Sequence, residues 1–256
     1  MKILASYNIK GGVGKTTCIV NLAYLAARDG YRTLLWDLDP QGAASFYFRI
    51  QPGIKGGLKG IFGRTRPLSA AIKATDYPGL DLVPADPSLR YLDLRLSGHN
   101  KPLKQFWKLI RPFDSEYDLV LLDCAPGISL ASENIFYAVD ALLVPVIPTT
   151  LSVRTLHQLK QYLAQADSKS PALLPFFSML DHRKRLHRET INTLSGQGHR
   201  FLQTIIPSAS QIEWMGVRRA PLGSYGIQSM AVMAFEKLWE EVRDRIGLEV
   251  GVQNGN

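Results

Sequence analysis

Residues 10–17 read Lys10-Gly11-Gly12-Val13-Gly14-Lys15-Thr16-Thr17. They follow one apolar run, Ile3–Tyr7, and precede another, Ile19–Ala27, so the glycines connect a short strand to a long helix. Glycines allow a tight turn that points successive amide hydrogens inward, and the helix adds the positive end of its dipole. The segment therefore predicts a phosphate-binding loop with a polyphosphate ligand.

The usual form of this loop has glycine five positions before Gly14, where this chain has Ile9 followed by Lys10. A loop with this second lysine resembles the deviant Walker A loop of the ParA/MinD family of dimeric ATPases. The resemblance implies an ATP/ADP site with Mg²⁺ in which Lys15 holds the β- and γ-phosphates and Thr16 binds the metal. It also implies that Lys10 reaches the nucleotide of a second subunit. The nucleotide-binding residues implied are Lys10, Gly11, Gly12, Val13, Gly14, Lys15, Thr16 and Thr17.

The remainder of the chain predicts one α/β domain. Apolar runs recur between helical segments, and several are continuous, as in strands buried on both faces. We expect strands at 3–7, 33–36, 80–83, 119–122, 141–147, 173–179 and 201–206. This pattern indicates a doubly wound, mostly parallel sheet flanked by helices. The resemblance implies that this is a P-loop NTPase fold similar to the nitrogenase iron protein. Residues 1–256 form the single domain, with 246–256 expected to be a flexible tail.

Local signals predict several boundaries. Gly30 is a stop for the first helix, Ser129 and Ser152 are candidate N-caps, and residues 235–246 form a last amphipathic helix. Residues 52–66 are rich in glycine and basic side chains, which predicts a loop with little regular structure. No apolar run approaches the ~20 residues of a membrane span, and the first strand starts at once, so we expect a cytoplasmic protein.

Carboxylates follow two of the predicted strands. Asp37-Leu38-Asp39-Pro40-Gln41-Gly42 follows the second, at the edge where α/β sheets bind ligands. In the resembled family the residue matching Asp39 positions the attacking water, and a carboxylate there can also order magnesium. Asp37 has a supporting role. Asp123 ends the apolar strand 119–122 in the manner of a Walker B aspartate and is expected to hold magnesium through water. Lys10, Lys15 and Asp39 are the predicted catalytic residues.

The resemblance extends from residue 2 to about residue 245 and weakens after residue 150. It implies that Pro207 packs against the adenine ring, although Ser208-Ala209 replace the Arg-Asn that often follows this proline in the family. The segment 124–128 reads Cys-Ala-Pro-Gly-Ile instead of the family's two prolines and a serine. This departure leaves the behaviour of the second switch segment open.

The two cysteines, Cys18 and Cys124, are too few for a disulfide framework. An iron-sulfur role must be considered, because the nitrogenase iron protein is a relative of the family. Small core residues are the favoured interpretation, since Cys18 begins a buried helix.

The chain has a formal net charge of +8, which suggests a polyanionic partner. Its densest cationic run is 181–188, and helical periodicity places cations on one face with Leu186, Ile191 and Leu194 on the other. Relatives of ParA type bind double-stranded DNA through scattered arginines, without sequence preference and only as the ATP-bound dimer. The candidate DNA-binding residues are Arg183, Lys184, Arg185, Arg188, Arg218 and Arg219. The alternative is a solvated helix face. His182 and His187 are expected at the surface, and Trp214 and Trp239 are expected to be packing residues rather than platforms for base stacking.

The resemblance implies a nucleotide-switched positioning ATPase with weak intrinsic activity, which forms a homodimer on ATP binding. The resemblance implies nucleoid association and a ParB-like or other cargo adaptor that stimulates hydrolysis. One alternative is a membrane-associated ATPase of MinD type, which the weakly charged tail 247–256 disfavours. Another is a metabolic ATP-dependent ligase that forms an amide or a ring, for which no substrate pocket is evident.

Overall fold

A computed structural model describes residues 1–165, 170–196, 200–225 and 228–249. Among these, one eight-stranded sheet has the order β3-β4-β2-β5-β1-β6-β7-β8. The strands are β1 (Lys2–Ser6), β2 (Thr33–Asp37), β3 (Lys73–Ala74), β4 (Leu80–Val83), β5 (Leu119–Asp123), β6 (Ala141–Val146), β7 (Ala172–Leu180) and β8 (Ile205–Pro207). All neighbours pair in parallel except β3 and β4. The predicted doubly wound, mostly parallel sheet is confirmed.

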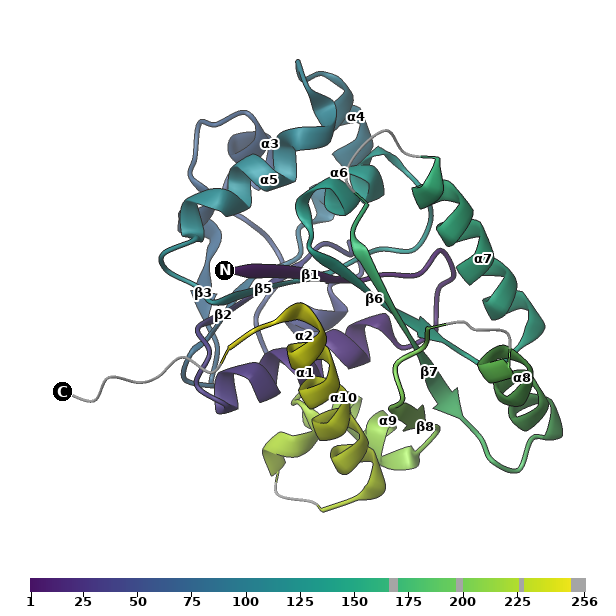
Figure 1. Ribbon diagram of the computed structural model, residues 1–256. Coiled ribbons are helices and arrows are strands. Elements are labelled where there is room, and N and C mark those ends of the chain that lie inside the picture. Colours follow the sequence, from purple (N-terminus) through teal and green to yellow (C-terminus); the bar gives the residue numbers. More distant parts are fainter. Residues whose placement is uncertain (166–169, 197–199, 226–227, 250–256) are drawn as a thin grey trace.

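Helices cover both faces of this sheet (Figure 1). They are α1 (Lys15–Arg28), α2 (Ala43–Tyr47), α3 (Gly57–Phe62), α4 (Leu92–Ser97), α5 (Gln105–Ile110), α6 (Leu130–Ala138), α7 (Thr150–Ala164), α8 (Arg185–Gly196), α9 (Ser210–Arg218) and α10 (Met230–Ile246). Helices α3 to α7 lie over one face, whereas α1, α9 and α10 lie over the other. None of the helices in the described part of the chain is long and apolar enough to cross a membrane.

Two hydrophobic cores explain why the strands are continuous apolar runs. Alternate residues of one strand point to opposite faces of a sheet. In β5, Val120 and Leu122 enter the core beneath α3 to α7, while Leu119 and Leu121 enter the core beneath α1 and α10. Because each face is covered, both sets must be apolar, as expected for a parallel sheet.

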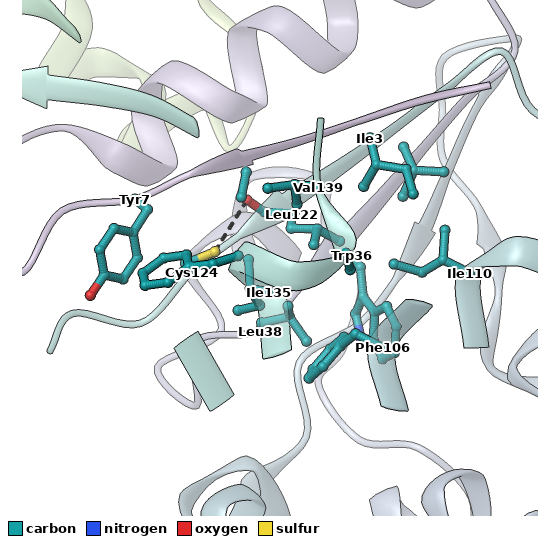
Figure 2. Close-up of a cluster of buried hydrophobic side chains, with 14 of the residues drawn as sticks. Ile3, Tyr7, Trp36, Leu38, Phe106, Ile110, Leu122, Cys124, Ile135 and Val139 are labelled. Atoms are coloured by element: carbon teal, nitrogen blue, oxygen red, sulfur yellow. Dashed lines mark hydrogen bonds between the residues drawn. The ribbon is translucent and has the colours of Figure 1, made fainter. Parts of the chain in front are cut away.

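The core beneath α3 to α7 is drawn in Figure 2. Trp36 of β2 lies against Phe106 of α5, with ring centroids 5.2 Å apart. Cys124 is buried in the same cluster near Tyr7, and Cys18 is buried in the other core. Burial raises the pKa of both thiols well above the ordinary value. The two cysteines are thus small core residues, as the favoured interpretation held.

Helix α1 ends as its sequence indicates. Gly30 has a positive φ of 90°, which a side chain would strain, and its N–H donates to the carbonyl of Ala27 (3.0 Å). The N–H of Tyr31 donates to the carbonyl of Ala26 (3.0 Å) and closes the helix. The predicted stop at Gly30 is confirmed.

Three local predictions were wrong, and one strand was missed. Residues 52–66 are not simply a loop, because α3 lies within them and buries Leu58, Ile61 and Phe62. The strand expected at 201–206 is much shorter, because only 205–207 form a strand, β8. Ser152 is buried inside α7, whose N-cap is Thr149, whereas Ser129 does cap α6 with a reciprocal bond to Ser132. The short antiparallel β3 was missed, because its two residues carry no periodic signal.

The first residues of the expected flexible tail, 246–256, pack on the domain. Ile246 is buried at the end of α10, and Leu248 packs against the core beneath that helix. The Tyr31 hydroxyl donates to the carbonyl of Leu248 (3.4 Å). The remaining residues of that prediction, 250–256, lie outside the described part of the chain.

Candidate functional site

The site forms at the carboxyl ends of three adjacent strands, β2, β5 and β1. The register pairs Ser6 with Asp123 and Asp37 with Asp123, so these side chains lie in one row across the sheet. Ligands of parallel α/β sheets bind at this edge. The loop 10–17 leaves β1 here and enters α1.

The loop needs glycine at its entry to α1. Gly12 and Gly14 have positive φ values of 70° and 94°, and Gly14 is the N-cap of α1. A Cβ on Gly14 would lie 2.9 Å from the Ser178 hydroxyl of the neighbouring β7. Without a side-chain cap, the first N–H groups of α1 are available to an anion.

Lys15 is largely buried and directed back into the loop. Its Nζ donates to the carbonyl of Lys10 (3.3 Å), and its own carbonyl accepts from the Ser6 hydroxyl (3.0 Å). Burial lowers the pKa of the Lys15 ammonium, while the negative charges of Asp123 and Asp39 partly offset this. An ammonium held in this position suits a phosphate ligand, which would replace the solvation that the lysine has lost.

Lys10 is positioned through its backbone. The buried Asn8 accepts from the N–H of Lys10 (2.9 Å) and donates to the carbonyl of Pro145 (2.8 Å). The Lys10 side chain is half-buried and makes no ion pair within the described residues. The sequence interpretation missed Asn8, because one asparagine after a strand gives no distinctive signal.

Asp123 is fully buried, and neither of its carboxylate oxygens has a hydrogen-bond partner among the described residues. Burial raises its pKa well above the ordinary value, and the nearby Asp37 raises it further. Thr16 lies near enough to oppose this shift, although its hydroxyl does not meet hydrogen-bond geometry with the carboxylate. Such an orphaned buried carboxylate is costly unless a cation completes its environment. Asp123 and Thr16 therefore fit a hydrated Mg²⁺, which prefers oxygen ligands.

The two aspartates after β2 have different surroundings. Asp37 is buried and accepts from the N–H and hydroxyl of Ser45 (2.8 and 2.7 Å), which fixes the start of α2. Burial raises the pKa of Asp37 to about 6, and the bonds from Ser45 oppose the shift. Asp39 is half-buried, and its Oδ1 accepts from the N–H of Gln41 (2.9 Å). The supporting role assigned to Asp37 agrees with this geometry, and Asp39 remains accessible for a ligand.

The unusual segment 124–128 forms hydrogen bonds with the residues that lead into the phosphate loop. The Tyr7 hydroxyl donates to the carbonyl of Gly127 (2.7 Å), and the N–H of Gly127 donates to the carbonyl of Ile9 (3.1 Å). Ile128, at its end, is partly exposed beside the Ser129 N-cap of α6. The departure from the family's sequence thus leaves this segment in contact with the loop.

The geometry agrees with comparisons to known proteins. A family model described as an AAA domain matches residues 1–174. The chromosome-partitioning ATPase Soj of Thermus thermophilus is 31% identical, over 95% of this chain and 96% of its own. The chromosome partitioning protein ParA of Myxococcus xanthus is 29% identical, over 95% of this chain and 88% of its own. The chain belongs to the ParA/Soj family of ATPases.

Similar folds serve more than one activity. Cobyrinic acid a,c-diamide synthase of Mycobacterium smegmatis, solved with ADP and magnesium, has a TM-score of 0.80 and 23% identity, covering 96% of this chain and 95% of that one. At this identity the likeness shows the fold alone. The ParA/Soj assignment therefore rests on the sequence matches.

Pro207 lies near the phosphate loop, as its predicted role requires. It lines a small cavity, about 30 Å³, together with Gly14, Thr17 and Cys18. This places Pro207 beside the first turn of α1. Packing against an adenine ring stays a prediction.

The candidate DNA-binding cations form two groups. Those near α8 are exposed, but several already have partners: Arg183 pairs with Asp181 (3.0 Å) and Arg185 with Glu189 (2.6 Å). Arg188 donates to the carbonyl of His182 (2.6 Å). The exposed Lys184 makes no ion pair among the described residues.

The helical pattern expected over 181–194 was wrong at its start, although Leu194 is buried and the cations are exposed as expected. Helix α8 starts only at Arg185, so Arg183 and Lys184 lie in the preceding turn. Leu186 is exposed, whereas His187, expected at the surface, is buried. The Nδ1 of His187 accepts a hydrogen bond from the N–H of Asp181 (3.2 Å).

The second group of cations ends α9. Arg218 lies over the Tyr225 ring at 5.7 Å, and Arg219 lies over the Phe46 ring at 4.6 Å. Trp214, expected to pack inside, is 53% exposed on the same helix, whereas Trp239 is buried as expected. Helix periodicity alone could not have separated these two tryptophans, because tertiary neighbours decide which face is covered.

Replacing Gly14 by alanine is expected to abolish nucleotide binding. The added Cβ meets the Ser178 hydroxyl and forces a strained positive φ, which together cost about 2–4 kcal/mol. Calorimetry with ATP and Mg²⁺ should show at least a hundredfold weaker affinity. Gly127→Ala is the matched control, because its φ is also positive but a Cβ there meets no atom within 4 Å. Equal losses in both variants would contradict a steric role for Gly14.

Proposed function

We propose that this ParA/Soj ATPase is a nucleotide-switched positioning protein. ATP and Mg²⁺ join two copies into a dimer, the dimer binds nucleoid DNA without sequence preference, and a cargo adaptor of ParB type stimulates hydrolysis and release. The observation that carries the proposal is the pairing of two lysines in one loop. Lys15 is folded into its own loop, whereas the Lys10 ammonium has no partner within the described chain.

The position of Lys10 supports a role between subunits. The N–H of Lys10 donates to Asn8 and its carbonyl accepts from Lys15, so the backbone is fixed while the side chain is available to another ligand. The γ-phosphate of a nucleotide bound to a second subunit would give the Lys10 ammonium a charge-assisted hydrogen-bond partner. Such a contact exists only when both nucleotide and second copy are present, which is the property of a switch.

The residues around the γ-phosphate position have distinct roles. Lys15 and the N–H groups of α1 would bind phosphate oxygens, and Asp123 with Thr16 would hold Mg²⁺, which neutralises developing phosphate charge. Asp39 would accept a hydrogen bond from the attacking water. We propose that intrinsic hydrolysis is slow and that the adaptor completes the positioning of that water.

Asn21 links the nucleotide loop to α9. It is buried in α1 one turn beyond Thr17, to whose carbonyl its Nδ2 donates (2.8 Å). The same group donates to the Met215 sulfur (3.3 Å), and Oδ1 accepts from the N–H of Leu222 (2.8 Å). A shift of the loop on nucleotide binding would therefore be transmitted to α9.

A second link runs from the Asp37–Gly42 segment through α2. Arg219 Nε donates to the carbonyl of Phe46 (3.2 Å), and α2 directly follows that segment. These contacts support nucleotide-dependent presentation of the cations that end α9.

The experiment that tests the proposed function uses Asp39→Ala. Without the carboxylate that positions water, hydrolysis is expected to fall at least about a hundredfold while ATP still binds. The variant should therefore co-sediment with DNA after excess ATP is washed away, whereas the wild type is released. Asp76→Ala, which removes an exposed carboxylate paired with Arg49, is the control. An Asp39→Ala protein that neither dimerises nor retains DNA would overturn the proposal.

The two cationic groups make different predictions for DNA affinity. If the group near α8 contacts phosphates, replacing Arg185 and Arg188 by alanine reduces the slope of log K against log salt by about 2. Arg218→Ala with Arg219→Ala should do the same for the other group. Fluorescence anisotropy with the ATP-bound protein measures both slopes. Lys55→Ala with Lys59→Ala removes two exposed cations near α3 and should leave the slope unchanged.

A further inference from the structure

A cavity between separate segments of the chain lies away from the nucleotide edge. It measures about 610 Å³ and is bounded by the end of α3 with the following turn, by α5, and by the turn before β5. Figure 1 shows α3 and α5 next to each other. Phe113 and Glu116 line the cavity and precede β5, so it lies toward the amino ends of the strands. It is distinct from the site described above, and its volume is within the range of ligand sites.

The cavity is cationic. Arg64, Arg66 and Lys108 line it, against one carboxylate, Glu116. None of the three cations forms an ion pair within the described part of the chain. Apolar side chains, among them Leu68 and Leu109, complete the lining. An occupant with both acidic and apolar groups matches this surface.

Gln105 gives a second, independent indication of an occupant. Its side chain lines the cavity and is 95% buried, with a relative exposure of 5%. Its Nε2 donates to the carbonyl of Lys101 (2.8 Å), but its carbonyl oxygen accepts no hydrogen bond from a described residue. This oxygen is open to the cavity, where it can accept a hydrogen bond from an occupant's donor, such as a peptide N–H.

The turn 64–66 that lines the cavity offers no free backbone N–H to a phosphate ligand. Phosphate sites commonly use free N–H groups of a turn. Here the N–H of Arg64 donates to Ile61, and those of Thr65 and Arg66 donate to Gly60.

We propose that this cavity binds an extended peptide segment in which acidic residues flank a large apolar one. Its carboxylates pair with Arg64, Arg66 and Lys108, its apolar side chain contacts Leu109, and a backbone N–H donates to Gln105. The site does not depend on the proposed DNA or positioning role, because it shares no residue with the nucleotide loop.

The test uses amide chemical shifts of the full chain titrated with a capped peptide of sequence Asp-Glu-Leu-Asp-Glu-Leu. Amides of residues 61–69 and 105–116 should shift, with and without ATP. A Lys-Lys-Leu-Lys-Lys-Leu peptide and inorganic pyrophosphate should leave them in place. No shift with the acidic peptide, shifts confined to other residues, or a pyrophosphate response at this cavity would overturn the proposal.

Charge reversal adds a second measurement. Arg64→Glu with Lys108→Glu should weaken the acidic peptide at least about tenfold, because two attractive contacts become repulsive. Lys59→Glu changes the same charge on α3 outside the lining and should alter affinity less than about twofold. The milder pair Arg64→Gln with Lys108→Gln provides the same comparison if the reversed variant does not fold. Equal affinities of the wild type and a folded double variant would contradict the proposal.

Discussion

Asp123→Asn is expected to abolish Mg²⁺-dependent ATP turnover while making the nucleotide-free protein more stable at neutral and higher pH. The carboxylate is fully buried and has no hydrogen-bond partner among the described residues, so its charge opposes folding until a cation arrives. An amide of the same shape removes that charge and the means of holding the metal. We expect turnover to fall at least about a thousandfold and the free energy of unfolding to rise by about 1–3 kcal/mol.

The stability of the nucleotide-free wild type should fall as pH rises and the Asp123 carboxyl becomes charged. Burial raises the pKa of Asp123 in the folded state above its value in the unfolded chain. The unfolded chain therefore releases this proton first, and the wild type loses stability as pH rises from about 4 toward the raised pKa. The advantage of Asp123→Asn in thermal melts without nucleotide should grow through that window. Mg²⁺ with ATP should reverse the order, since only the wild type gains from the ligand.

Asp118→Asn is the matched control, because Asp118 precedes the same strand. The Arg32 guanidinium lowers the pKa of Asp118, and the two groups pair at 2.7 Å near the surface. Because the pKa of Asp118 is lower in the folded protein than in the unfolded chain, the Arg32–Asp118 pair stabilises the fold at pH values above the unfolded pKa. This stabilisation is lost as pH falls and Asp118 is protonated. The control variant should thus be destabilised at neutral pH, by less than about 1 kcal/mol. If Asp123→Asn lowered the stability of the nucleotide-free protein at pH 8, the claim that the unpaired Asp123 charge opposes folding would be wrong.

Lys10→Ala is expected to abolish ATP-dependent dimerisation while leaving ATP binding to one chain largely intact. The alanine keeps both backbone contacts of residue 10, the N–H to Asn8 and the carbonyl to Lys15. Only the ammonium is lost. In a two-fold dimer two such contacts disappear, each worth about 1.5–3 kcal/mol, so the dimer should dissociate more than about a hundredfold more readily.

Size-exclusion chromatography with ATP and Mg²⁺ measures this result, with calorimetry for nucleotide affinity. Lys15→Ala provides the contrast, because it should lose nucleotide binding itself and dimerisation with it. Lys55→Ala removes an exposed lysine outside the loop and should behave as the wild type. Dimerisation of Lys10→Ala at wild-type concentrations would show that the ammonium has no role between subunits.

The sequence predicted the part of the fold that local rules determine. The loop 10–17 lies between β1 and α1 because glycines, a following apolar helix and a buried strand each require that arrangement. Asp123 was found for a similar reason, since a carboxylate that ends a wholly apolar strand is unusual. The edge of the sheet then brings together residues that are distant in the chain.

Other features depend on tertiary contacts that leave no local pattern. Helix α3 forms in a glycine-rich segment because Leu58 and Phe62 enter the core beneath α3 to α7. Asn21 resembles any polar residue in a helix, and its bonds to Met215 and Leu222 join segments far apart in sequence. The cavity between α3 and α5 likewise arises only when separate turns are folded together.

Light scattering of the wild-type chain, at saturating Mg²⁺ with and without a non-hydrolysable ATP analogue, tests the central claim most directly. We expect the molecular mass of one chain in the solution without the analogue and of two chains in the solution with it. The same mass in both solutions, with analogue binding confirmed by calorimetry, would contradict a switch that works by joining two copies.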